Sequence, residues 1–216
     1  MLTYKIHLIR HGLTQANLEG RYIGATDLPL CPEGLAGLRR LQAECDYPPV
    51  DRVYTSPLLR ARQTADLLFP DRQVVEEPDL RELAFGVFEN RTGAELDGDP
   101  AFRRWLSDPS ARPPGGESAA ELAARVEGAL AHIFAEMMRE RLPSVAVVTH
   151  GGVIACLLAA MGLPQREPAR WNAGPGEGYT LLLSTQMWMR DHKFEVYGAL
   201  PWPREPAGEA PGWEWV

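Results

Sequence analysis

The feature that most constrains the fold of this chain is the alternation of short apolar segments with longer helical patterns. Segments typical of β-strands lie at residues 4–9, 52–55, 73–76 and 145–149, and each is followed by turn residues and a helical pattern. A later segment, 179–184, is expected to form an edge strand. This order predicts an α/β fold: a three-layer sandwich with a mainly parallel central sheet flanked by helices.

Helix start and stop signals occur between these strands. Ser56 followed by Pro57 is typical of an N-cap with proline in the first turn, and predicts a helix that ends near residue 69. Ser118 and Glu121 form a capping-box pattern at the start of the longest helix, which Pro143 ends. Two further helices are expected, at about 33–45 and 151–162.

The length of 216 residues is enough for one domain with a full hydrophobic core. We expect residues 1–200 to form this domain, with a helical insertion at about 86–114, where the periodicity is weaker. Residues 201–216 form a tail rich in proline and tryptophan, whose rings are expected to pack on the domain surface or to serve a partner. The tryptophans of the tail are Trp202, Trp213 and Trp215.

Charge and cysteine content argue against several classes of protein. The formal net charge of −7 argues against a general nucleic-acid binder, because that function needs clustered lysine and arginine. The three cysteines are too few and too scattered for a disulfide framework or a zinc cluster. The sequence starts without a signal-peptide pattern, and its longest apolar run, 153–161, is too short to cross a membrane. We expect a cytoplasmic protein with a small-molecule ligand, and no nucleic-acid or membrane partner.

Side chains suited to catalysis follow the predicted strands. They are Arg10 and His11 after the first strand, Arg60 after the second, Glu82 after the third and His150 after the fourth. In open α/β sheets, ligands bind beyond the carboxyl ends of the parallel strands. We therefore expect these side chains to converge, although they lie far apart in the sequence.

Phosphoryl transfer is the chemistry that this set of side chains suits. Guanidinium groups match the oxygens of a phosphate dianion, and backbone N–H groups at Gly12 and Gly151 add affinity for an anion where helices begin. A neutral imidazole can attack phosphorus, and a carboxylic acid with a raised pKa can protonate the leaving oxygen. Each residue alone is also typical of structural or exposed positions, so the joint pattern carries the hypothesis. Arg62 is expected to be exposed, and the other histidines to be structural: His7, His132 and His192.

Four motifs resemble those of the histidine phosphatase superfamily, in the branch that holds the cofactor-dependent phosphoglycerate mutases and their phosphatase relatives. The motifs are LIRHGLTQAN at 8–17, SPLLRARQTA at 56–65, LREL at 80–83 and VTHGG at 148–152. They occur in family order. The resemblance implies a phosphoglycerate mutase-like fold and a metal-independent phosphomonoesterase that needs no organic cofactor and acts on a small phosphorylated metabolite.

The resemblance also implies roles for individual residues. His11 would form a phosphohistidine, and Glu82 would protonate the leaving group and then activate water. The residues expected to hold the phosphate or the substrate are Arg10, Arg60, His150, Asn17, Gly24 and Gly151.

A phosphatase is favoured over a mutase by two differences from the mutase pattern. The mutases carry a longer insertion after the acid motif, and a hydroxyl residue before the glycine that corresponds to Gly24. This chain has Ile23 there, whose side chain cannot donate a hydrogen bond to a substrate carboxylate. Residues 20–30 and 113–118 are similar to alpha-ribazole phosphatases of cobalamin assembly and also to broad-specificity members, so that substrate is one hypothesis.

Three alternatives stay open. The first is a mutase, which would move phosphate between positions of one substrate. The second is a binding module that captures phosphoesters or a partner protein without turnover. The third is a metallohydrolase that uses His11, His150, Glu82 and Asp27, although their spacing is unlike that of metal-binding motifs.

Overall fold

The central sheet of the computed structural model, which describes residues 3–108 and 110–204, has the strand order β4-β3-β5-β1-β7-β8-β6. Its parallel part comprises β1 (Thr3–Arg10), β3 (Arg52–Thr55), β4 (Val74–Glu76) and β5 (Ser144–Thr149). β7 (Gly178–Ser184) pairs antiparallel with both β1 and β8 (Phe194–Leu200), while β6 (Gly162–Leu163) pairs parallel with β8. The predicted α/β class with a mainly parallel sheet is confirmed.

β5 is buried on both faces, which explains its unbroken apolar run. Val145 and Val147 of β5 belong to one hydrophobic core, and Ala146 and Val148 belong to the core on the opposite face. The register sets Ile6 of β1 beside Val145, so neighbouring strands contribute to the same core layer.

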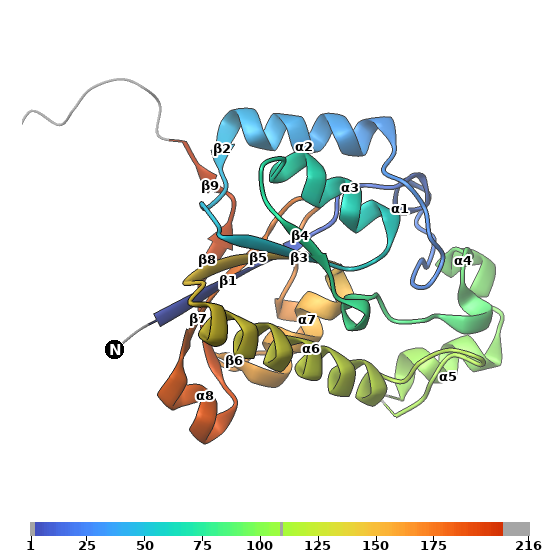
Figure 1. Cartoon of the computed structure of the whole chain (residues 1–216). Coiled ribbons are helices and arrows are strands. Elements are labelled where there is room, and N and C mark those ends of the chain that lie inside the picture. Colours follow the sequence, from blue (N-terminus) through green and yellow to red (C-terminus); the bar gives the residue numbers. More distant parts are fainter. Residues whose placement is uncertain (1–2, 109, 205–216) are drawn as a thin grey trace, which may run out of the picture.

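Helices cover the two faces of the sheet (Figure 1). α2 (Pro32–Glu44) and α3 (Leu59–Leu68) lie on one face, and α6 (Ala119–Glu140) and α7 (Gly151–Met161) lie on the other. α6 begins at the capping box of Ser118 and Glu121, as predicted, and buries one or two side chains in each turn from Leu122 to Met137.

Short elements complete the described chain. They are α1 (Gln15–Leu18), β2 (Cys45–Asp46), η1 (Pro78–Leu80), η2 (Gly86–Phe88), α4 (Gly93–Leu96), α5 (Pro100–Ser107), η3 (Pro168–Arg170), α8 (Thr185–Asp191) and β9 (Trp202–Pro203). β9 pairs with β2 and leaves Trp202 exposed, whereas Trp213 and Trp215 lie outside the described residues. No helix in the described ranges is long and apolar enough to span a bilayer.

The helices at 86–107 have a small core of their own. Phe88, Leu96 and Phe102 are buried in it, and Tyr22 and Phe85 are among the half-buried side chains that pack against it. The rings meet edge to face, with centroids 5.3 Å apart for Tyr22 and Phe85. We refer to the aromatic residues of this core as the aromatic cluster: Tyr22, Phe85, Phe88, Phe102 and Trp105.

Two predicted elements differ from the structure. β7 is not an edge strand, because the unpredicted strand β8 folds back and pairs beyond it. α3 begins at Leu59 rather than after an N-cap at Ser56. The backbone N–H of Leu59 donates to Asp27 Oδ1 at 2.6 Å, so a residue distant in the sequence satisfies the first turn.

Candidate active site

The ends of the parallel strands bring the predicted side chains to one edge of the sheet, at a cleft of about 400 Å³. Arg10, His11 and Glu82 line this cleft. His150 is fully buried beside it, with its ring centroid 5.0 Å from that of His11. Arg60 is 1% exposed, and its charge acts on His11. A larger cleft, of about 620 Å³ beside residues 165–170, holds none of these side chains, so the charged groups rather than the volume mark the site.

The backbone sets the tautomer of His11. Its Nδ1 lies 2.7 Å from the carbonyl oxygen of Gly12, which only accepts hydrogen bonds, so Nδ1 carries the proton and Nε2 keeps its lone pair. Burial, followed by the Arg60 guanidinium, lowers the pKa of His11 to about 3. The imidazole is therefore neutral near neutral pH, with Nε2 available as a nucleophile.

His150 has one engaged and one unengaged ring nitrogen. Nε2 lies 2.8 Å from Ser56 Oγ, whereas the buried Nδ1 has no hydrogen-bond partner among the described residues. Burial, followed by the proximity of His11, lowers the pKa of His150 well below its usual value. A buried polar atom without a partner indicates a position that a ligand or water satisfies. Ser56, predicted only as a helix N-cap, is thus a neighbour of the site.

Glu82 lies near both arginines of the site, but no carboxylate of the described residues accepts a hydrogen bond from either. Arg60 donates from Nη1 to the carbonyl of Thr26 and from Nη2 to the carbonyl of Gly24, both at 2.9 Å. Arg10 donates from Nη1 to the carbonyl of Ala173 at 2.9 Å. Carbonyl oxygens orient a guanidinium without cancelling its charge. Because their hydrogen bonds go to neutral carbonyls, these two guanidiniums favour an anionic ligand.

Glu82 lines the same cleft as Arg10 and His11. Its Oε1 accepts a hydrogen bond from the Leu83 backbone N–H and its Oε2 accepts one from the Gly152 N–H, each at 2.9 Å. Burial raises the pKa of Glu82 despite these hydrogen bonds and the nearby arginines. A Cβ atom at Gly152 would collide with the Glu82 carboxyl group, so the glycine allows this close approach.

The other predicted binding residues have different surroundings. Asn17 and Gly151 line the cleft, although Asn17 Oδ1 also accepts hydrogen bonds from the backbone N–H and the hydroxyl of Thr14. Gly24 does not line the cleft. Its carbonyl instead orients Arg60, and its N–H donates to the Glu89 carboxylate at 3.1 Å.

Glu89 is a supporting residue that the sequence analysis missed. Its carboxylate accepts hydrogen bonds from the backbone N–H groups of Gly24, Ala25 and Phe85, at 3.1, 2.9 and 3.1 Å. It thereby ties the loop that orients Arg60 to the segment that follows Glu82. No local pattern in the sequence marks this residue.

The metal-site alternative needs Asp27 beside the histidines. Asp27 instead lies at the start of α3, where its carboxylate accepts from the Leu59 N–H. Within residues 3–108 and 110–204, no group of three or more histidine, cysteine, aspartate or glutamate side chains could hold a metal ion.

A mainly parallel sheet with this cluster at its strand ends defines a phosphoryl-transfer enzyme of the α/β class. The family model of the histidine phosphatase superfamily (branch 1) matches residues 6–190. The chain belongs to this superfamily.

Curated relatives and solved structures agree with this assignment. The adenosylcobalamin/alpha-ribazole phosphatase of Salmonella typhimurium is 33% identical over 162 residues, which cover 73% of this chain and 79% of the relative. The "Probable phosphoglycerate mutase GpmB" of Proteus mirabilis is 34% identical over 166 residues, 74% of this chain and 76% of the relative. The crystal structure of the alpha-ribazole phosphatase from Shigella flexneri superposes with a TM-score of 0.76 at 25% identity, covering 93% of this chain and 96% of that one. Family and relatives together support a phosphatase enzyme.

Proposed function

We propose that the protein hydrolyses a small phosphate monoester, without a metal ion, through a phosphohistidine on His11. The observation that carries the proposal is the state of His11. Its Nδ1 proton is held by the Gly12 carbonyl, and its neutral Nε2 is left as the nucleophile. Arg10 and Arg60, oriented by carbonyl oxygens, supply the positive charge for a phosphate.

In the first half-reaction, Nε2 of His11 attacks phosphorus and the bond from phosphorus to the ester oxygen breaks. The Glu82 carboxyl, with its raised pKa, gives its proton to that oxygen, so the product leaves as a neutral alcohol. Arg10 and Arg60 stabilise the charge on the transferring phosphoryl group.

His150 would assist through its unengaged nitrogen. Nε2 of His150 lies 2.8 Å from the Ser56 hydroxyl, which can donate or accept. In the tautomer that carries its proton on Nδ1, Ser56 donates to Nε2 and Nδ1 is the donor for a phosphoryl oxygen.

In the second half-reaction, the Glu82 carboxylate takes a proton from a water molecule as that water attacks the phosphohistidine. The bond between phosphorus and Nε2 breaks, and inorganic phosphate leaves. Glu82 is again protonated and His11 is again neutral, so both groups return to their starting states.

The walls of the cleft support an alcohol that carries an aromatic ring as the leaving group. Tyr22, Phe85 and Trp171 also line the cleft, and aromatic walls stack on planar rings. Ile23, also in the lining, offers no donor to a substrate carboxylate. Alpha-ribazole phosphate, the substrate class in the names of the relatives, fits this description better than phosphoglycerate, the substrate of the mutase alternative.

The first experiment is hydrolysis of 4-nitrophenyl phosphate in EDTA by the wild type and by His11→Ala. We expect the wild type to stay active in EDTA and the variant to lose turnover by about a thousandfold or more. A brief reaction quenched in base should also trap a phosphoenzyme in the wild type alone. Loss of wild-type activity in EDTA would contradict the metal-free mechanism. A wild type that isomerises phosphoglycerate without releasing phosphate would favour the mutase.

A further inference from the structure

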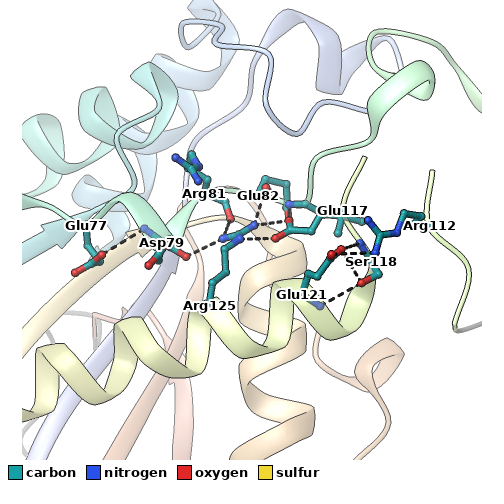
Figure 2. A network of polar contacts seen from close by, with 10 residues as sticks. Glu77, Asp79, Arg81, Glu82, Arg112, Glu117, Ser118, Glu121 and Arg125 are labelled. Carbon is teal, nitrogen blue, oxygen red and sulfur yellow. Dashed lines mark hydrogen bonds and ion pairs between the residues drawn. The ribbon is translucent and has the colours of Figure 1, made fainter. Parts of the chain in front are cut away.

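One guanidinium on α6 is bonded through all its donors to the segment that carries Glu82. Arg125 Nη1 donates to the carbonyls of Asp79 and Arg81, both at 2.7 Å, and Nη2 donates to the carbonyl of Glu82 at 3.1 Å. Nε and Nη2 also donate to the Glu117 carboxylate, at 2.6 and 2.7 Å. All the N–H donors of an arginine are thereby used. Figure 2 shows Arg125 reaching from the helix to this segment, with Glu117 beside it.

The segment bonded in this way has little regular structure of its own. After β4 and the short turn η1, the chain runs without helix or strand through Glu82. The carbonyl of Leu80 accepts from Thr149 Oγ1 at 2.8 Å, so the carbonyls of residues 79–82 are all held by side chains from β5 and α6. The position of the Glu82 backbone is therefore set from outside its own segment.

Arg125 lies on a well-packed part of α6, and its ion-pair partner Glu117 is mostly buried. The neighbouring Val126 is fully buried in the core, and Leu122 lies 5% exposed one turn earlier. The side chains of Arg125 and Glu117 are only 15% and 16% exposed. The backbone N–H of Glu117 also donates to the carbonyl of Ala84 at 2.9 Å, which ties Glu117 to the same segment beyond Glu82.

We propose that Arg125, oriented by Glu117, is a positioning residue for the proton transfer of Glu82. The proposal rests on the proposed function, in which Glu82 is the proton donor. Arg125 touches neither the cleft that holds His11 nor the reacting atoms. It acts by holding the Glu82 backbone so that the carboxyl group stays within proton-transfer distance of the leaving oxygen. A displacement of about 1 Å at such a site can cost about a hundredfold in rate.

Two substrates with different leaving groups make the role measurable. 4-Nitrophenyl phosphate has an activated leaving group that needs little protonation, whereas glycerol 2-phosphate releases an alkoxide that needs a full proton. Glu82→Gln sets the reference, because it should slow the alkyl ester more than the aryl ester. We expect Arg125→Ala to show the same selectivity, with kcat lowered about tenfold on glycerol 2-phosphate, less than about threefold on 4-nitrophenyl phosphate, and KM nearly unchanged.

Conservative and control variants separate positioning from folding. Arg125→Lys should recover little of the kcat that Arg125→Ala loses on glycerol 2-phosphate, because an ammonium group cannot bond three carbonyls and a carboxylate together. Glu117→Gln should give a smaller loss of the same selectivity, because it keeps one acceptor. Arg112→Ala is the matched control. It removes an arginine that pairs with Glu121 at the exposed start of the same helix, at 2.9 Å, and that donates no hydrogen bond to residues 79–82, and should leave both rates unchanged.

The decisive comparison is the double variant Glu82→Gln/Arg125→Ala. If Arg125 acts through Glu82, then Arg125→Ala should cost little once Glu82 is already replaced. Additive losses, or equal losses of Arg125→Ala on both substrates, would overturn the positioning role. A Glu82→Gln variant that slows both esters equally would instead overturn the proposed acid. If Arg125→Ala does not fold, Glu117→Gln carries the same test, with thermal unfolding measured for each variant.

Discussion

The cleft joins two regions built in different ways: a floor of charged and imidazole groups (Arg10, His11, Arg60, Glu82 and His150) and an aromatic rim (Tyr22, Phe85 and Trp171). In the floor, His11, Arg60 and His150 are buried while Arg10 and Glu82 are half-buried; in the rim, Trp171 is buried while Tyr22 and Phe85 are half-buried. Floor side chains follow the parallel strands, and their hydrogen-bond partners are backbone groups and one buried hydroxyl. Tyr22 and Phe85 belong to the aromatic cluster of the 86–107 helices, and Trp171 lies on a loop that is otherwise largely exposed.

This difference indicates that catalytic rate and substrate selectivity depend on separate parts of the cleft. The floor side chains follow the strands of the sheet and are held in place by hydrogen bonds. A small displacement of these side chains should therefore lower the catalytic rate. The rim stands on elements outside the sheet, so its side chains can change the substrate without disturbing the nucleophile. The following predictions test this separation, starting with the largest expected effect.

Two arginines close together in the second motif should behave oppositely. Arg60 is buried and donates hydrogen bonds to the carbonyls of Gly24 and Thr26. Arg62 instead pairs with Glu76 on the surface, and its side chain is 42% exposed. We expect Arg60→Ala to lower kcat/KM by about 100- to 1000-fold, because it removes charge-assisted hydrogen bonds to the phosphate. Arg62→Ala should stay within about twofold. Similar kcat/KM values for the two variants on 4-nitrophenyl phosphate would contradict the assignment of Arg60 to the phosphate site.

Acid should destabilise the fold through its buried histidines. Burial, with Lys5 as the second cause, lowers the pKa of His7 to about 4, and the pKa of His11 falls to about 3. Below pH 6.5 the unfolded chain binds protons that the folded chain does not, so stability falls as the pH falls from 6.5 towards 4. His7 alone should account for about 2 kcal/mol between pH 7 and pH 5.

Urea unfolding at the two pH values measures this effect and also distinguishes the floor from the sheet interior. His7 contacts Thr180 and Ser144 rather than the cleft. His7→Gln should therefore reduce the pH dependence whether or not phosphate is present. Inorganic phosphate should bind at the floor rather than at His7, so at each pH it should stabilise the wild type and His7→Gln by the same amount. If the stability of His7→Gln depends on pH as strongly as that of the wild type, His7 does not cause the loss of stability in acid.

The smallest effect is expected at the rim. Trp171 is buried against Tyr179 and lines the cleft, with ring centroids 5.4 Å apart. Trp171→Ala should raise KM about three- to tenfold for an aromatic monoester such as alpha-ribazole phosphate and leave glycerol 2-phosphate within about twofold. Trp202→Ala, in β9 and outside the cleft, is the control for loss of a tryptophan. A loss of kcat on both esters would place Trp171 with the floor rather than the rim.

Much of the parallel sheet was predictable from local pattern. β3 was predicted with its observed bounds, and β1, β4 and β5 within one residue at each end, because turn residues bound each of these apolar or β-branched segments. The capping box before α6 was also predictable, because its two partners lie three residues apart in the sequence. The convergence of the floor residues followed from a rule about strand ends, while their individual roles stay predictions.

The sequence by itself determined the class of sheet, the main helices and the types of side chain that end its strands, because periodicity and capping are properties of neighbouring residues. Only the tertiary structure decided that Ser56 meets His150, that Asp27 caps α3, that Glu89 holds the loop of Gly24, and that Arg125 holds the segment of Glu82. It also decided that β7 is an interior strand. The physical reason is that a hydrogen bond or a strand pairing depends on distance in space, and the fold joins residues such as Ser56 and His150 across many residues of chain.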